Sequence, residues 1–120
     1  MESTYRAWVI AENRMEYTVC VSPWHVGDGD RFSWKHDEVK LMLRTGLNDV
    51  DNKPSYYKDI VDFEGALYVI EWDKEDTGFY LADIKDLGDP DSEYHYKGRC
   101  IREGKIVGNV YENANLIKSL

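Results

Sequence analysis

The sequence predicts a mainly β protein, with a small barrel in its C-terminal half, additional N-terminal strands and a short C-terminal helix. Short runs of strand-forming residues fill residues 57–111, and Gly and Asp turns separate them. Nine Tyr and four Trp against three Phe shift the aromatic residues toward types favoured in strands and at interfaces. Because 120 residues suffice for one core, we expect a single domain over residues 1–120.

The additional strands are expected within residues 1–44. A hairpin is predicted from a strand at residues 5–9, a turn at 12–14 and a return strand at 15–21. In the return strand Tyr17, Val19 and Val21 alternate with Glu, Thr and Cys. This alternation predicts that the three side chains share one face.

Two further segments lie before the barrel. Phe32 and Trp34 alternate with polar neighbours, which indicates a short strand. Residues 39–44 alternate with period two, which favours a strand, with a short helix as the alternative. Residues 45–54 are rich in Gly, Asn, Asp and Pro, so they predict a polar loop and an internal boundary.

The barrel strands are expected at residues 58–63, 66–72, 79–81 and 105–111. A turn over residues 75–78 joins the second and third of them, and residues 83–92 form an acidic loop. Residues 94–96 are a candidate edge strand. Residues 100–102 either pair with the last barrel strand or form a 3-10 turn.

A short helix is predicted over residues 113–120. Asn113 is a suitable N-cap, and Leu116, Ile117 and Leu120 recur at helical spacing. A helix this short is marginal alone, so it needs to dock on the rest of the fold.

The net charge of −8 disfavours nucleic-acid binding, which depends on clustered cations against phosphate. Such binding would require one face to gather the cations Arg44, Lys53, Lys58 and Arg99. The sequence has no apolar run long enough for a membrane helix, and its first residues lack the apolar core of a signal peptide. We therefore expect a soluble cytoplasmic protein whose thiols, Cys20 and Cys100, are reduced and buried.

No motif for catalysis, a metal or a cofactor is present. The Asp residues of the acidic loop do not follow the spacing of a calcium loop. The histidines, His25, His36 and His95, lack the spacing of a zinc site, and no nucleophile elbow appears. We predict a non-enzymatic protein with no catalytic, metal or cofactor residues.

Aromatic side chains offer the strongest argument for binding. The candidate binding surface comprises Tyr68, Trp72, Tyr80, Tyr94 and Tyr96. The alternative is that these rings fill or rim the β core. Residues with an expected structural role in turns are Asp59, Gly78, Gly108 and Asn109, the first because its carboxylate can accept backbone N–H groups.

Three groups of segments together resemble the YopX family of phage and prophage proteins, over nearly the whole chain. They are Tyr-Arg-Ala-Trp at 5–8 with Asn-Arg-Met at 13–15, Thr-Gly-Leu-Asn-Asp at 45–49 with Tyr-Lys-Asp-Ile-Val at 57–61, and Val-Gly-Asn-Val-Tyr-Glu-Asn at 107–113 with Leu116. The last is the most specific. Lys58 stands where the family usually has Gly, and Ala114 where Pro often follows Asn, so the turn and the helix start are expected to differ.

The resemblance implies an SH3-type barrel core over residues 57–111 and an origin in a phage, prophage or mobile element. It supplies no catalytic residues. We expect a non-enzymatic protein-binding or regulatory module, and the alternative is a nucleic-acid-associated accessory protein of phage replication or packaging. We also expect a protein partner, self-association into a homo-oligomer through strand edges, and a location in the cytoplasm of a bacterial host.

Overall fold

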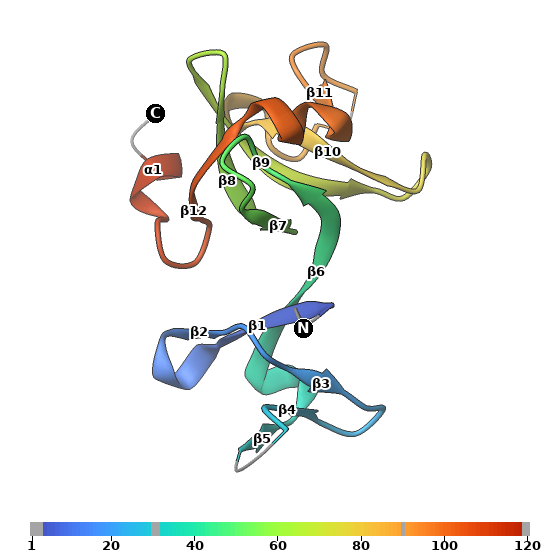
Figure 1. Ribbon diagram of the computed structural model, residues 1–120, viewed down its shortest axis with the longest axis vertical. Helices are drawn as coiled ribbons and strands as arrows, with labels where there is room; N and C mark the ends of the chain where they lie inside the picture. Colours follow the sequence, from blue (N-terminus) through green and yellow to red (C-terminus); the bar gives the residue numbers. More distant parts are fainter. Residues whose placement is uncertain (1–3, 30–31, 90, 119–120) are drawn as a thin grey trace. The chain divides into compact units, whose positions relative to one another are not determined.

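The computed structural model describes residues 4–29, 32–89 and 91–118 and confirms a mainly β fold (Figure 1). Among the described residues, strands far outweigh helices. The chain divides into two compact units, Met1–Arg44 and Thr45–Leu120. The unit boundary lies at the start of the segment for which the sequence predicted one, and the single-domain organisation stays a prediction.

The first unit contains the predicted N-terminal hairpin. Strand β1 (Tyr5–Val9) pairs antiparallel with β2 (Arg14–Glu16), and the short helix η1 (Ile10–Glu12) connects them. Asn13 closes this connection in the left-handed conformation, with φ of 47°, as Asn at a turn readily does.

The prediction of a return strand over residues 15–21 is wrong. Strand β2 ends at Glu16, the chain bends at residues 17–18, and pairing resumes in β3 (Cys20–Val21). Because of this bend Val19 is buried while Tyr17 and Val21 are 50% and 41% exposed. The three side chains therefore do not share one buried face.

A small sheet, β3-β4-β5, completes the first unit. It pairs β3 with β4 (Val26–Gly27) and β4 with β5 (Ser33–Trp34), which confirms the short strand expected near Trp34. The helix η2 (His36–Glu38) follows. The core of this unit consists of Ala7, Val9, Val19, Val26, Trp34 and Val39.

Cys20 is exposed and Cys100 is half-buried, so the prediction of two buried thiols is wrong for Cys20. Both residues of its strand, β3, are exposed.

Strand β6 (Val39–Asn48) is a strand, not a helix, and it is longer than expected. Its first five residues pair with β1. The predicted loop therefore shrinks to residues 49–53, because Thr45–Asn48 continue the strand and β7 (Pro54–Tyr56) lies next to β6 in the same sheet. Gly46 absorbs a φ of +88° within the strand, a conformation that most residues avoid.

The second unit is built on an antiparallel sheet in the order β11-β10-β9-β8-β12, curled into a half-barrel (Figure 1). The strands are β8 (Asp59–Phe63), β9 (Ala66–Asp73), β10 (Gly78–Asp83), β11 (Tyr96–Lys97) and β12 (Lys105–Asn109). The short helices are η3 (Ile84–Asp86), η4 (Gly98–Glu103) and α1 (Asn115–Lys118). The 3-10 alternative for residues 100–102 is the correct one, and the SH3-type assignment stays a prediction.

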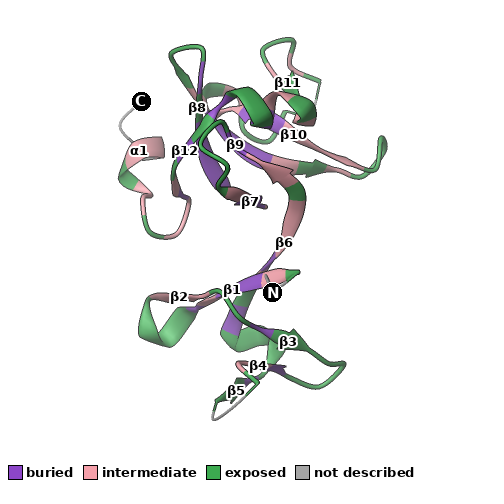
Figure 2. Cartoon of the chain, in the orientation of Figure 1, coloured by how far each residue is buried: buried purple, intermediate pink, exposed green. Residues whose placement is uncertain are grey.

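The main core cluster of the second unit lies on one face of this sheet, and Ile60, Val69 and Ala82 are buried on the other. Figure 2 shows buried residues in β8 and β9. The members of the main cluster are Val61, Phe63, Tyr68, Ile70, Leu81, Ile101 and Ile106. The predicted C-terminal helix is present as α1, and positions 119–120 of the predicted range, Leu120 included, lie outside the described residues.

Candidate functional site

The five aromatic residues predicted to form a binding surface do not gather on one face. Tyr68 is 6% exposed and belongs to the core, so it contributes no exposed ring. Tyr96 packs edge-on against Tyr68, with ring centroids 5.4 Å apart, and stays 39% exposed. Tyr94 is 61% exposed and lines a separate cavity of about 400 Å³ with Asp83, Lys85 and Asp86.

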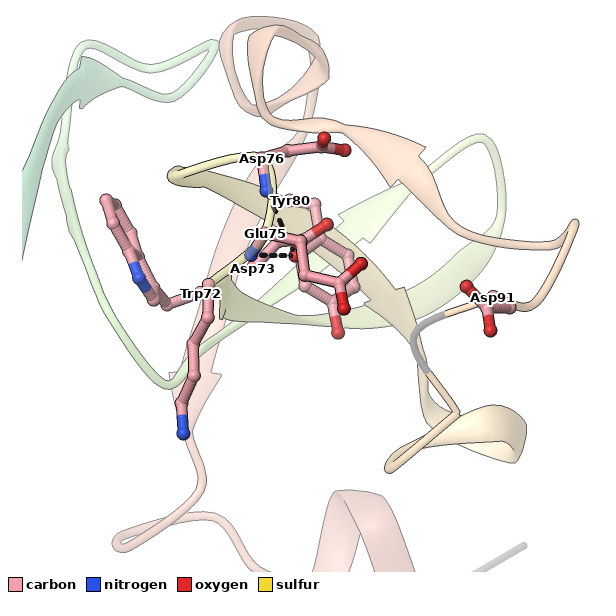
Figure 3. A pocket seen from close by; sticks show the side chains of 7 residues that line it. Trp72, Asp73, Glu75, Asp76, Tyr80 and Asp91 are labelled. Carbon is pink, nitrogen blue, oxygen red and sulfur yellow. Dashed lines mark hydrogen bonds between the residues drawn. The ribbon is translucent and has the colours of Figure 1, made fainter.

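Trp72 and Tyr80 belong to opposite faces of the β9–β10 pair. Trp72 stands opposite Phe79, and the two rings pack edge to face at 4.9 Å. Tyr80 stands opposite Glu71, on the other face, because successive strand residues point to opposite sides. Figure 3 shows the Trp72 ring pointing away from Tyr80.

A cavity of about 420 Å³ lies beside Tyr80 and is rimmed by carboxylates (Figure 3). Its lining consists of Trp72, Asp73, Lys74, Glu75, Asp76, Tyr80 and Asp91. We call it the Tyr80 cavity. Asp73 is the last residue of β9, Glu75 and Asp76 lie in the β9–β10 turn, and Asp91 comes from the loop after β10. An aromatic ring with several carboxylates is a chemistry that favours a cation.

The turn that carries these carboxylates is fixed by Asp73. Its Oδ1 accepts hydrogen bonds from the N–H groups of Glu75 (2.9 Å) and Asp76 (3.4 Å), as Asp side chains at turns commonly do. Thr77 completes the turn with φ of 49°. Asp73 therefore positions the turn, while the side chains of Glu75 and Asp76 are exposed at the cavity.

The charges that act on Tyr80 are mostly negative. Desolvation raises the pKa of Tyr80, and the charges of Glu71 and Asp73 raise it further, against a smaller opposite effect of Lys58. Lys58 Nζ lies 2.6 Å from Glu71 Oε1 and 4.8 Å from the centre of the Tyr57 ring. Burial lowers the pKa of Lys58, but the hydrogen bond and charge of Glu71 outweigh it, so the net direction is upward.

These shifts predict that the protein loses stability in alkali. The pKa values of Tyr68, Tyr80 and Lys58 are raised in the folded state from ordinary values of 10.0, 10.0 and 10.5, that of Tyr68 chiefly by desolvation. A raised folded pKa stabilises the protein fully below the unfolded value, and this stabilisation is lost as the pH rises through the folded value. We expect the free energy of unfolding, measured by urea denaturation, to fall above about pH 10.

The matched variant for this experiment is Tyr68→Phe with Tyr80→Phe, which removes two of the three titrating groups. Its stability is expected to decline less steeply with pH than that of the wild type. A wild-type stability that stays level or rises over the same interval would contradict the assignment.

The described ranges contain no group of three or more His, Cys, Asp and Glu side chains arranged to hold a metal ion. In the same ranges no helix has both the length and the apolar character that crossing a membrane requires.

The family model of the YopX protein matches residues 4–118. The chain belongs to the YopX family. A search of curated proteins finds no match. The crystal structure of protein EF1440 from Enterococcus faecalis is similar in fold, with a TM-score of 0.66 and 17% sequence identity over 95% of this chain and 96% of that chain.

The YopX closing segment stabilises the turn after β12. Asn109 Oδ1 accepts the N–H groups of Tyr111 (3.0 Å) and Glu112 (2.9 Å), and Asn109 Nδ2 donates to Glu112 Oε1. Asn113 Oδ1 accepts the N–H of Asn109 at 3.1 Å. A Cβ atom at Gly108 would overlap the Asn113 side chain, so only Gly leaves room for it. These hydrogen bonds and this close contact give the closing segment a structural role in the turn.

The central YopX segments are also structural. Asp49, 6% exposed, accepts N–H groups of Asp51 and Lys53 through Oδ1 and of Ile106 through Oδ2. Asp59, 2% exposed, accepts the N–H of Tyr56 at 2.9 Å. Gly78, the fourth residue assigned a turn role, begins β10 without a positive φ.

Lys58, expected to stand at a position of Gly, has a φ of 73°, in the left-handed region that Gly favours. The expectation that the departure from Gly alters the turn stays a prediction. Holding a non-Gly residue there costs about 1–2 kcal/mol. The ion pair with Glu71 and the contact with Tyr57 offset part of that cost.

Sequence reasoning named Tyr80 but missed its carboxylate neighbours. The sequence predicted a turn over residues 75–78 but no role for the carboxylates in and beside it. The alternation of side chains along β9 would have placed Trp72 on the opposite face of the strand from Glu71 and Asp73. No local signal, however, indicates that Asp91 approaches the same cavity.

Proposed function

We propose that this YopX protein is a non-enzymatic protein-binding module that receives a basic segment of a protein partner at the Tyr80 cavity. The observation that carries the proposal is the combination of an aromatic ring with four carboxylates around one cavity. The charge of the two units agrees with it. Residues 45–120 contain 16 acidic and 9 basic residues, a net charge of −7 out of the −8 of the whole chain.

The proposed setting is a phage, prophage or mobile element that acts in the cytoplasm of a bacterial host. Membership in the YopX family and the similarity in fold to a protein of a bacterium support this setting. Nucleic-acid binding has less support, because Lys58, one of the four cations it would need, is paired with Glu71.

We also propose that the protein self-associates, but not by pairing of the edge strand β12 with a second copy. The N–H of Ile106 in that edge strand donates to Asp49, and the N–H of Asn109 donates to Asn113. An edge whose donors are capped by side chains pairs poorly with another strand. A homo-oligomer would therefore use other surfaces, and sedimentation at high concentration measures whether it forms.

The proposed binding is tested by titrating the protein with a synthetic peptide rich in Arg and Lys in a calorimeter. The informative variant combines Glu75→Gln, Asp76→Asn and Asp91→Asn, because all three side chains are exposed and line the cavity. Loss of three partly solvated charge contacts is expected to weaken binding about tenfold.

The matched control removes three exposed carboxylates elsewhere in the same unit, by Asp62→Asn, Glu64→Gln and Glu103→Gln. This control is expected to bind within about a factor of two of the wild type. Equal loss in both triple variants would show that net charge alone attracts the peptide and would overturn the proposal. Tighter binding of a labelled oligonucleotide than of the peptide would favour the nucleic-acid alternative.

A further inference from the structure

His95 lies against Tyr80, and its hydrogen bonds define its protonation state. Its Nδ1 receives the backbone N–H of Asp83 at 3.0 Å, and its Nε2 contacts the carbonyl oxygen of Asp89. A backbone N–H only donates and a carbonyl only accepts. The ring is therefore neutral here, with its proton on Nε2 and a bare Nδ1.

This arrangement is incompatible with a second proton on the ring. A proton on Nδ1 would point at the N–H of Asp83, so two donors would meet and the hydrogen bond would be lost. The ring centroid lies 5.2 Å from that of Tyr80, with the planes inclined at 53°. A charge acquired by His95 would consequently appear beside the Tyr80 cavity.

The charged side chains of the loop that holds His95 are Asp83, Lys85, Asp86, Asp89, Asp91 and Glu93, and Lys97 of β11 stands opposite Tyr80. Asp83, Asp86 and Asp89 already accept hydrogen bonds from backbone or hydroxyl donors of the same loop. On the side of Tyr80, the charges of Glu71, Asp73 and Lys58 act on its ring. The surroundings of His95 are therefore mostly acidic.

The geometry points to His95 as a pH switch on the Tyr80 cavity, in which protonation weakens the binding of a cationic ligand. The inference rests on the proposed function, because it concerns the ligand of that same site. Two effects act in the same direction. The imidazolium repels the bound cation, and loss of the Asp83 hydrogen bond releases the ring from its position against Tyr80.

The test is calorimetric titration of the full chain with the Arg- and Lys-rich peptide at about pH 7.5 and about pH 5.5, an interval in which a histidine changes charge while carboxylates stay ionised. We expect wild-type affinity to fall about tenfold between these conditions. In His95→Gln, which stays neutral at both, the affinity is expected to be nearly constant. The variant retains His25 and His36, so it isolates the contribution of His95.

A pH dependence that His95→Gln shares with the wild type overturns the inference and leaves the proposed function standing. Absence of peptide binding at both pH values overturns the proposed function and the inference with it. A readout without peptide is the NMR shift of the Asp83 amide in the wild type. It is expected to move together with protonation of the His95 ring, and an amide shift that stays constant through that titration overturns the inference alone.

Discussion

Asp49→Ala is expected to lower the free energy of unfolding by about 3–4 kcal/mol, because hydrogen bonds to a charged acceptor contribute roughly 1.5–3 kcal/mol each. The carboxylate accepts three backbone N–H groups from two segments far apart in the sequence, the loop after β6 and strand β12. Alanine would leave the N–H of Ile106, in a residue only 7% exposed, without its acceptor. Denaturation by urea, followed by circular dichroism, measures the loss.

Asp51→Ala is the matched control for this substitution. Asp51 lies two residues away in the same loop and is exposed, so its removal is expected to change stability by less than about 0.5 kcal/mol. The Asp49 variant should also self-associate more readily, because it uncovers a donor on the edge of β12. Equal stability of the two variants would show that Asp49 does not join the loop to the sheet.

Gly98→Ala is expected to destabilise the protein by about 3 kcal/mol, in the upper range for substitutions that overpack a well-filled site. A Cβ atom at Gly98 would overlap the carbonyl oxygen of Phe79 and lie 3.1 Å from its carbonyl carbon. The obstacle is backbone, which cannot rotate away as a side chain does. Strand β10 would therefore have to shift relative to η4.

Gly78→Ala provides the control, because it makes the same chemical change in the same sheet. At Gly78 the nearest atom to an added Cβ is 3.9 Å away, and neither glycine has a positive φ. Since both substitutions reduce the freedom of the unfolded chain alike, the difference between them isolates the steric effect. Denaturation midpoints that coincide for the two variants would contradict the close approach of η4 to β10.

The sequence predicted elements where alternation agrees with pairing, and it failed where tertiary contacts override local preference. The runs that became β8 and β9 alternate or are continuously apolar, so periodicity finds them. Thr45, Gly46 and Asn48 look like turn residues but extend β6, because β7 lies beside them in the sheet. In the first unit, the bend after Glu16 contains no Gly or Pro that would predict an interruption of the strand.

The candidate site was only partly predictable for a similar reason. Tyr80 is visible as an aromatic strand residue, and the register that places it opposite Glu71 follows from the length of the β9–β10 turn. The approach of Asp91 and the tilted contact of His95 with Tyr80 depend on the path of a loop, which carries no periodic signal. Tyr68 was misplaced because a Tyr in a strand suits either a core or a surface.

The most direct test of the central claim is an NMR titration of the labelled full chain with the Arg- and Lys-rich peptide. We expect amide shifts to concentrate on residues 73–76, Tyr80 and Asp91, to saturate, and to diminish as salt is added. Saturable binding at those residues would establish the Tyr80 cavity as the site for a basic segment. An unchanged spectrum, or shifts confined to residues outside the cavity, would contradict it.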